Sequence, residues 1–309
     1  MATLLAQRVP LVGAPVLAIV VGVVIRALYP LPAALRPGIS YAARKVLQAA
    51  IIVSGLGLSF VTVVQTGVGT LPLTLLTIAV ALLLTPVVGR ALRIDWALRQ
   101  LVGVGTAICG ASAIAAVATV IDPPESEVAL SIATVFFYNV VAVLLFPPLG
   151  HLMHMTQQAF GVWAGTAIND TSSVVAAGFS YGREAGAEAT IVKLTRATMI
   201  LPIVAMIAFL KARREHRGKS VPWRAIVPWF IVWFLVAALL NTAGFIPASW
   251  HGAITFVATF LITTALGAIG LQTELGRLIR TGAAPLGLGL ILWIAVAVSA
   301  LAVQRVMGI

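Results

Sequence analysis

The sequence predicts an all-α membrane protein, a polytopic bundle of about ten transmembrane helices that forms one transporter domain over residues 1–309. Hydrophobic residues occupy 61% of the 309 positions, charged residues occupy 9%, and the mean hydropathy is +1.07. Soluble domains average roughly 45–50% apolar and about 25% charged residues. A chain of this composition has more apolar surface than a soluble fold can bury, so its first partner is the lipid bilayer.

Ten apolar segments reach the length of about 20 residues that a helix needs to cross the hydrocarbon core. The first is interpreted as a span and not as a signal peptide, because its apolar run continues to Tyr29 and ends at Pro30 without a clear cleavage site. The approximate limits of the ten segments are 11–29, 45–65, 70–90, 100–121, 127–148, 159–180, 189–210, 225–243, 252–272 and 283–305.

The charged residues indicate how the chain is oriented. The 20 Lys and Arg outnumber the 9 Asp and Glu and lie in short gaps between apolar segments, which favours anionic headgroups over nucleic acid as their partner. The stretch KARREHRGK, residues 211–219, predicts a cytoplasmic loop of a protein of the bacterial inner membrane. Counting crossings from this loop gives every other loop a predicted side.

The predicted inside loops carry Arg90 and Arg93, and Arg277 and Arg280. The predicted outside loops are acidic, with Asp122, Glu125 and Glu127 in one and Glu184 and Glu188 in another. Residues 150–158 should lie inside but fit poorly, because the only ionisable side chains there are two histidines.

Two internal similarities point to repeats, which in many transporters have inverted topology and meet as interrupted helices at the bilayer midplane. GTAICGAS at residues 105–112 resembles GTAINDTS at 165–172, at an offset of 60 residues and two predicted helices. GL at 55–56 with TG at 66–67 resembles GL at 270–271 with TG at 281–282, at an offset of 215 residues and seven predicted helices. An odd helix offset implies inversion, so the second is interpreted as the repeat and the first as local convergence.

The fourth segment is rich in glycine and hydroxyl residues, among them Thr106 and Ser112. Small residues permit close helix packing, but the same composition suits an interrupted helix whose free backbone groups line a substrate cavity. The sequence leaves these two interpretations open. In the second one, Thr106 and Ser112 bind substrate.

The sixth segment has a run of five polar residues, Asn169, Asp170, Thr171, Ser172 and Ser173, which cannot face lipid. An ionised carboxylate inside a span costs at least about 2.5–3.5 kcal/mol, so Asp170 favours function. We interpret Asp170 as the coupling site for H⁺ or Na⁺, and Asn169, Thr171 and Ser172 as substrate-binding residues.

Lys193 and Arg196 lie three residues apart and therefore on one face of the seventh segment. One interpretation makes them structural ion-pair partners of Asp170, and the other makes them the residues that hold an anionic substrate. Both could apply at different stages of one transport cycle.

Other kinds of function have less support. Cys109 is the one cysteine and the histidines do not cluster, so we expect no metal site and no cofactor beyond a coupling ion. The chain has no HExxH or GxSxG motif and no second intramembrane aspartate, so we expect no enzyme. An anion channel and a non-transporting assembly subunit stay as alternatives, and a homo-oligomer is compatible with the sequence.

Four runs, residues 101–116, 160–178, 191–202 and 265–282, resemble the YeiH family of bacterial inner-membrane proteins, which is also named for sulfate export. The resemblance implies a secondary transporter, with sulfate or a sulfonate as examples of a small anionic substrate. Many members have a further N-terminal span, and some have His-Glu where this chain has Asn169-Asp170, which puts a proton relay through position 169 in doubt. Substrate identity, coupling ion and direction of transport stay open.

Overall fold

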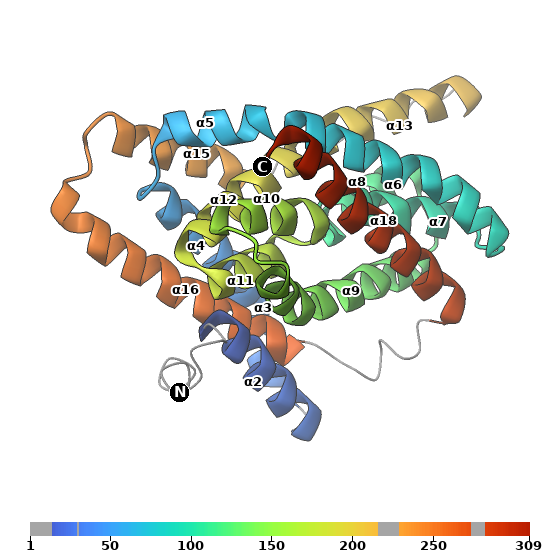
Figure 1. The fold of residues 1–309 in the computed structure, drawn as a ribbon. Helices are drawn as coiled ribbons and strands as arrows, with labels where there is room; N and C mark the ends of the chain where they lie inside the picture. The colour runs from blue at the N-terminus through green and yellow to red at the C-terminus, as the bar shows by residue number, and fades with distance from the viewer. Residues whose placement is uncertain (1–13, 30, 216–228, 273–281) are drawn as a thin grey trace.

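The computed structural model describes residues 14–29, 31–215, 229–272 and 282–309, and these residues form helices and turns with no strand among them (Figure 1). The helices are α2 (Ala14–Leu28), α3 (Arg36–Tyr41), α4 (Leu47–Gly55), α5 (Phe60–Gly69), α6 (Leu71–Ala91), α7 (Trp96–Ala107), α8 (Ala111–Ile121), α9 (Glu125–Leu152), α10 (Gln157–Ala167), α11 (Thr171–Tyr181), α12 (Arg183–Thr198), α13 (Ile200–Glu215), α15 (Trp229–Thr242), α16 (His251–Gln272) and α18 (Ala283–Met307), with short helical turns at Ala33–Leu35, Ala42–Val46 and Ala248–Trp250.

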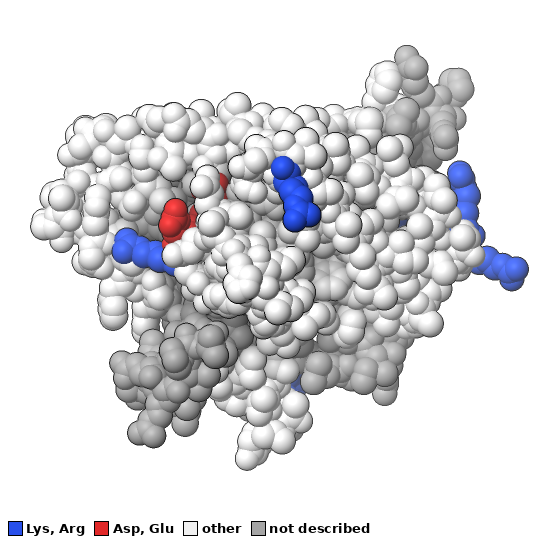
Figure 2. Space-filling view, viewed as in Figure 1, with Lys and Arg blue, Asp and Glu red and all other residues white. Residues whose placement is uncertain are grey.

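The predicted polytopic membrane bundle is confirmed in its class. In the described part of the chain, five helical segments are long and apolar enough to cross a bilayer: Leu71–Ala91, Glu125–Leu152, Arg183–Phe209, Ala248–Gln272 and Ala283–Met307. The pair Ala33–Gly55 and Phe60–Gly69, bent by 108°, is a sixth candidate. The surface in Figure 2 carries few charged side chains, and helices such as α6 expose large apolar ones, which suits contact with lipid.

The sixth predicted span does not cross, because its two ends lie together. Gln157 Oε1, at the start of α10, accepts hydrogen bonds from the backbone N–H of Glu184 at 3.0 Å and of Ala185 at 3.3 Å, just after the end of α11. The Tyr181 hydroxyl donates to the Met155 carbonyl at 2.5 Å. Helices α10 and α11 therefore form a hairpin that enters the bundle, turns at residues 168–170 and returns to the same side.

The fourth predicted span is a second hairpin, made by α7 and α8. A Cβ atom placed on Gly105 in α7 would lie 2.8 Å from the Ile114 side chain in α8, which is possible only if the chain folds back between them. The start of α7 packs with the start of α9, because Ile94 and Leu98 share an apolar cluster with Leu130. Both ends of this hairpin thus lie where α9 begins.

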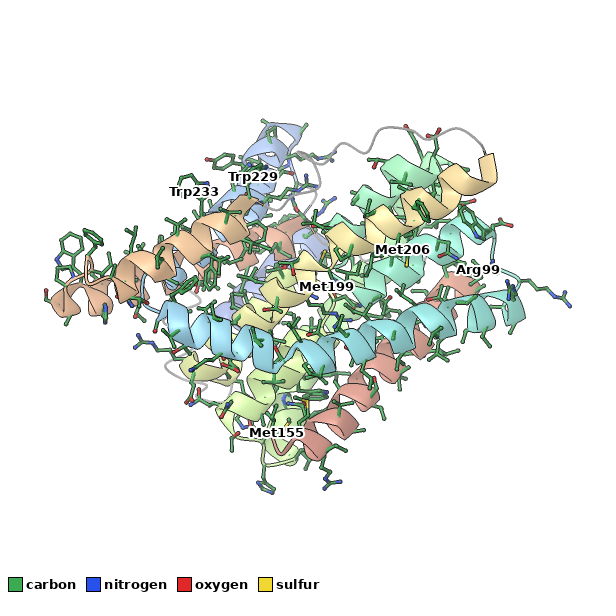
Figure 3. The ribbon with its side chains drawn as sticks, turned by 90° about the horizontal axis from the view of Figure 1, so that it is seen from above. Arg99, Met155, Met199, Met206, Trp229 and Trp233 are labelled. Carbon is green, nitrogen blue, oxygen red and sulfur yellow. The ribbon has the colours of Figure 1, made fainter. Side chains whose placement is uncertain are left out.

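The two hairpins enter from opposite sides, because α9 connects them and is long enough to cross the bilayer. Figure 3 shows Arg99, in the first turn of α7, and Met155, just before α10, at separate ends of the bundle with Met199 between them. Helices α12 and α13 then cross back as the segment Arg183–Phe209. The basic stretch 211–219 follows this crossing in the sequence, and with its predicted cytoplasmic position the α7–α8 hairpin is expected to open on the cytoplasmic side.

This topology corrects two predicted loop positions. The loop with Asp122 and Glu125 lies at the same end of the bundle as the start of α7, and residues 150–158 lie at the opposite end, away from the predicted cytoplasmic loops. The acidic loop does not contradict this orientation, because Asp and Glu contribute little to the positive-inside rule. His216 to Lys219, Arg277 and Arg280 lie outside the described residues.

The hairpins also correct the interpretation of the internal similarities. α7 and α10 end at Ala107 and Ala167, α8 and α11 begin at Ala111 and Thr171, and each pair differs by 60 residues. The similarity at offset 60, interpreted from the sequence as local convergence, therefore joins equivalent positions of two oppositely directed hairpins. Part of the second similarity, Thr281, lies outside the described residues.

Candidate functional site

The tip of the first hairpin is the break between α7 and α8, at Ile108, Cys109 and Gly110. Gly110 has φ +67° and ψ −132°, a conformation that L-residues with a Cβ atom rarely adopt. A Cβ atom on Gly110 would lie 3.5 Å from the Cβ atom of Asp170 on the other hairpin. The two tips therefore meet inside the bundle, as the predicted interruptions near Thr106 and Asn169 require.

The tip of the second hairpin carries Asp170 as the N-cap of α11. Its Oδ2 atom accepts a hydrogen bond from the Ser172 backbone N–H at 2.9 Å and another from the Ser172 hydroxyl. The backbone N–H of Asp170 donates to Asn139 Oδ1 on α9 at 3.2 Å. Asp170 thus satisfies orphan donors at the helix start, a role in which a carboxylate is typical.

Lys193 on α12 joins the two tips. Its Nζ atom donates to the Ile108 carbonyl at 2.8 Å and to the Ile168 carbonyl at 2.9 Å, and its side chain is fully buried. These carbonyls stand at the C-terminal ends of α7 and α10, where a helix leaves its last C=O groups without a partner. A cation at such an end is also favoured by the helix dipole.

Arg196, three residues further along α12, binds the end of α7 alone. Its Nε atom donates to the Ala107 carbonyl at 2.8 Å and its Nη2 atom to the Thr106 carbonyl at 3.2 Å. The guanidinium is fully buried, and its Nη1 atom has no hydrogen-bond partner among the described residues. Among the described residues, backbone carbonyls and not Asp170 hold both cations, so the predicted structural ion pair does not form.

Further unpaired polar groups lie in the second hairpin. Within the part of the chain that the structure describes, both amide atoms of Asn169 and the Thr166 hydroxyl lack a hydrogen-bond partner, although Asn169 is 1% exposed and Thr166 fully buried. Leaving such a group unpaired costs about 1–3 kcal/mol each. Unpaired buried groups beside an interrupted helix are expected where a ligand or water completes the hydrogen bonding.

The remaining predicted residues have different positions. Thr106 is buried and contributes its carbonyl to Arg196, and Ser172 is engaged with Asp170. Ser112, in the first turn of α8, is exposed, and Thr171 is half-buried. The structure therefore brings all the predicted residues to the two tips. Thr106 and Ser172 make contacts there through backbone groups, the Thr106 carbonyl with Arg196 and the Ser172 N–H with Asp170.

Asn139 and the carbonyls of Ile108 and Ile168 are the site groups beyond the predicted residues. Asn139 is a single amide within an apolar helix, a pattern that indicates a packing hydrogen bond more than a ligand-binding residue. The carbonyls carry no side-chain signal, but the matching AI dipeptides at 107–108 and 167–168 mark both positions.

The tips carry an excess of positive charge. Lys193 and Arg196 are two basic side chains at the tips, and among the described residues one carboxylate, that of Asp170, lies there with them, so that in their ionised forms these groups carry one net positive charge. The C-terminal ends of α7 and α10 bring about −0.5 charge each, and the N-terminal ends of α8 and α11 bring about +0.5 each, so the four helix ends cancel.

Comparison with known proteins shows a family. Residues 1–289 match the family described as "Conserved hypothetical protein 698". The UPF0324 membrane protein SAG1125 of Streptococcus agalactiae is 35% identical over 314 residues, covering 99% of this chain and 93% of that protein. The UPF0324 membrane proteins of Streptococcus pneumoniae and Fusobacterium nucleatum are 39% and 37% identical, cover 97% of this chain each, and are themselves covered to 91% and 92%. No solved structure matches, and none of these names mentions sulfate or export.

Proposed function

The chain belongs to the family of UPF0324 membrane proteins, and on that premise we propose that it is a secondary active transporter of a small anion. The anion binds where the tips of the two opposed hairpins meet, in contact with Asn169 and the free Nη1 atom of Arg196. Sulfate and sulfonates are the first substrates to test. A multi-pass position in the bacterial inner membrane follows from the same proposal.

The observation that carries the proposal is the uncompensated positive charge at the tips. A buried charge in the bilayer interior costs at least about 2.5–3.5 kcal/mol on the insertion scale, and such residues usually serve transport or ion binding. Lys193 and Arg196 are both fully buried, yet only one carboxylate accompanies them at the tips among the described residues. A structural role alone does not account for an excess of basic over acidic side chains, whereas a bound anion would balance it.

The same count of charged side chains at the tips supports coupling of anion transport to a cation. A monovalent anion would neutralise the single excess charge, whereas a divalent anion such as sulfate would leave one negative charge behind. Uptake of one H⁺ or Na⁺ at Asp170 would neutralise that remainder, and Asp170 lies where the tips meet, with its Cβ atom 3.5 Å from a Cβ atom placed on Gly110. We therefore propose Asp170 as the coupling residue.

The test is flux into proteoliposomes that contain the purified protein, with labelled sulfate, a sulfonate and chloride as probes under imposed pH or Na⁺ gradients. The proposal predicts saturable uptake that an unlabelled anion on the other side accelerates. A channel would give flux without this acceleration. No flux of any probe, with protein shown to be folded, would contradict the carrier proposal and favour an assembly subunit.

A further inference from the structure

We propose that one face of α8, formed by Ser112, Ala115 and Thr119, is the water-lined route by which the anion reaches the hairpin tips from the cytoplasm. The inference rests on the proposed function for its substrate, a small hydrated anion. The inference adds the side of the membrane from which the anion reaches the site in this conformation.

The first observation is the exposure of this face. Ser112, Ala115 and Thr119 are all exposed, and their spacing of three and four residues places them on one side of the helix. The residues between them on the other side, such as Ala113 and Val117, are fully buried. The exposed face runs from the tip of the hairpin to its cytoplasmic end.

The second observation is the kind of residue exposed. On α6 the exposed positions carry large apolar side chains, including Leu83, 71% exposed, and Val87, 63% exposed. Such residues suit lipid chains. The α8 face has only small side chains, which leave room for water. It also has two hydroxyl groups, of which that of Thr119 donates to the Ala116 carbonyl at 2.7 Å and can still accept a hydrogen bond.

The third observation is that the equivalent face of the other hairpin is closed. At the offset of 60 residues, Ser172 and Val175 of α11 are buried and Phe179 is half-buried. Where the two arms of this hairpin end, the Tyr181 ring stacks on those of Phe160 and His151, with ring centroids 3.8 Å and 4.3 Å apart. Two hairpins of related sequence therefore differ in access, and only the cytoplasmic one is open along its second arm.

The route ends at groups that lack partners. Arg196 binds the carbonyls of Thr106 and Ala107 at the tip of this same hairpin, and its fully buried Nη1 atom is unpaired there. Asn169, 1% exposed at the opposite tip, has two unpaired amide atoms. An anion that moves along α8 would therefore meet unsatisfied donors where the exposed face stops.

Cysteine reactivity tests the route without requiring transport. Ser112→Cys, Ala115→Cys and Thr119→Cys are each made in full-length protein, and Ser172→Cys and Val175→Cys are their matched controls on α11. Leu83→Cys reports a lipid-facing position. The wild-type protein, whose single Cys109 is buried, gives the background rate. The probe is a membrane-impermeant, negatively charged thiol reagent applied to inside-out or right-side-out vesicles.

We expect the three α8 cysteines to react from the cytoplasmic side at least about tenfold faster than the α11 and Leu83 positions, because only a hydrated thiol forms the reactive thiolate readily. Sulfate should slow the reaction at Ser112→Cys. Reaction from outside alone, or reaction only with a membrane-permeant uncharged maleimide, would overturn the route. Labelling as expected with no anion flux in proteoliposomes would uphold the route and reject the carrier.

Discussion

Gly110 and Asp170 stand 60 residues apart in the sequence and face each other at the tips of two hairpins that enter from opposite sides. A Cβ atom on Gly110 would lie 3.5 Å from that of Asp170. This contact places the start of α8 beside the carboxylate that caps α11. The break in each helix is thus part of one shared site.

Gly110→Ala should destabilise the protein by about 1–3 kcal/mol, because alanine would be held in a backbone conformation that L-residues avoid. Thermal unfolding in detergent measures the loss. Gly252→Ala is the control, since a Cβ atom there meets nothing within 4 Å and its backbone is unstrained. Equal unfolding temperatures for the two variants would show that the tip does not need its glycine.

Lys193→Met should also lower the unfolding temperature, because the buried carbonyls of Ile108 and Ile168 would lose their donor, at a cost of about 1–3 kcal/mol each. Lys45→Met makes the same chemical change at an exposed lysine and should leave stability unchanged. If both variants have the unfolding temperature of the wild-type protein, Lys193 does not hold the tips together.

Asp170→Asn should keep the fold and abolish gradient-driven anion uptake. Asparagine caps a helix about as well as aspartate, whereas alanine at an N-cap costs about 0.5–2 kcal/mol. Asp170→Ala should therefore lose both stability and flux. Thermal unfolding and proteoliposome flux are compared for the two variants, and wild-type flux in Asp170→Asn would exclude Asp170 as the coupling residue.

Gly22→Ala should separate α2 from α16. A Cβ atom at Gly22 would lie 2.5 Å from the carbonyl oxygen of Gly267 and 2.9 Å from the Cα atom of Gly270, and backbone atoms cannot move aside as side chains can. Close approach through small residues is a common way for helices to associate in membranes. The unfolding temperature should fall, with Gly38→Ala unchanged because open space surrounds it.

The sequence was sufficient to predict the membrane class and the two interrupted helices, because apolar composition and runs such as Asn169 to Ser173 are local signals. It could not reveal that the interrupted segments turn back. Two apolar arms of 11 or 12 residues each are together as long and as apolar as one helix that crosses the membrane. The difference lies in contacts such as that of Gln157 with Glu184, which link the two ends of a segment.

The roles of Lys193 and Arg196 were only half predictable for the same reason. Two basic residues on one helix face within an apolar segment indicate buried cations that need partners. Their partners, however, are backbone carbonyls that are freed only where α7 and α10 end. Those ends depend on the fold, so side-chain reasoning considered only Asp170 and a substrate.

The most direct test of the two opposed hairpins is the labelling of cysteines at their four ends with a membrane-impermeant maleimide. Asp95→Cys and Ser126→Cys flank the first hairpin, and His154→Cys and Arg183→Cys flank the second; all four positions are exposed. We expect the first pair to react only in inside-out vesicles and the second pair only in right-side-out vesicles. Reaction of the two members of either pair from opposite sides would mean that the segment between them crosses the membrane, and would contradict the account.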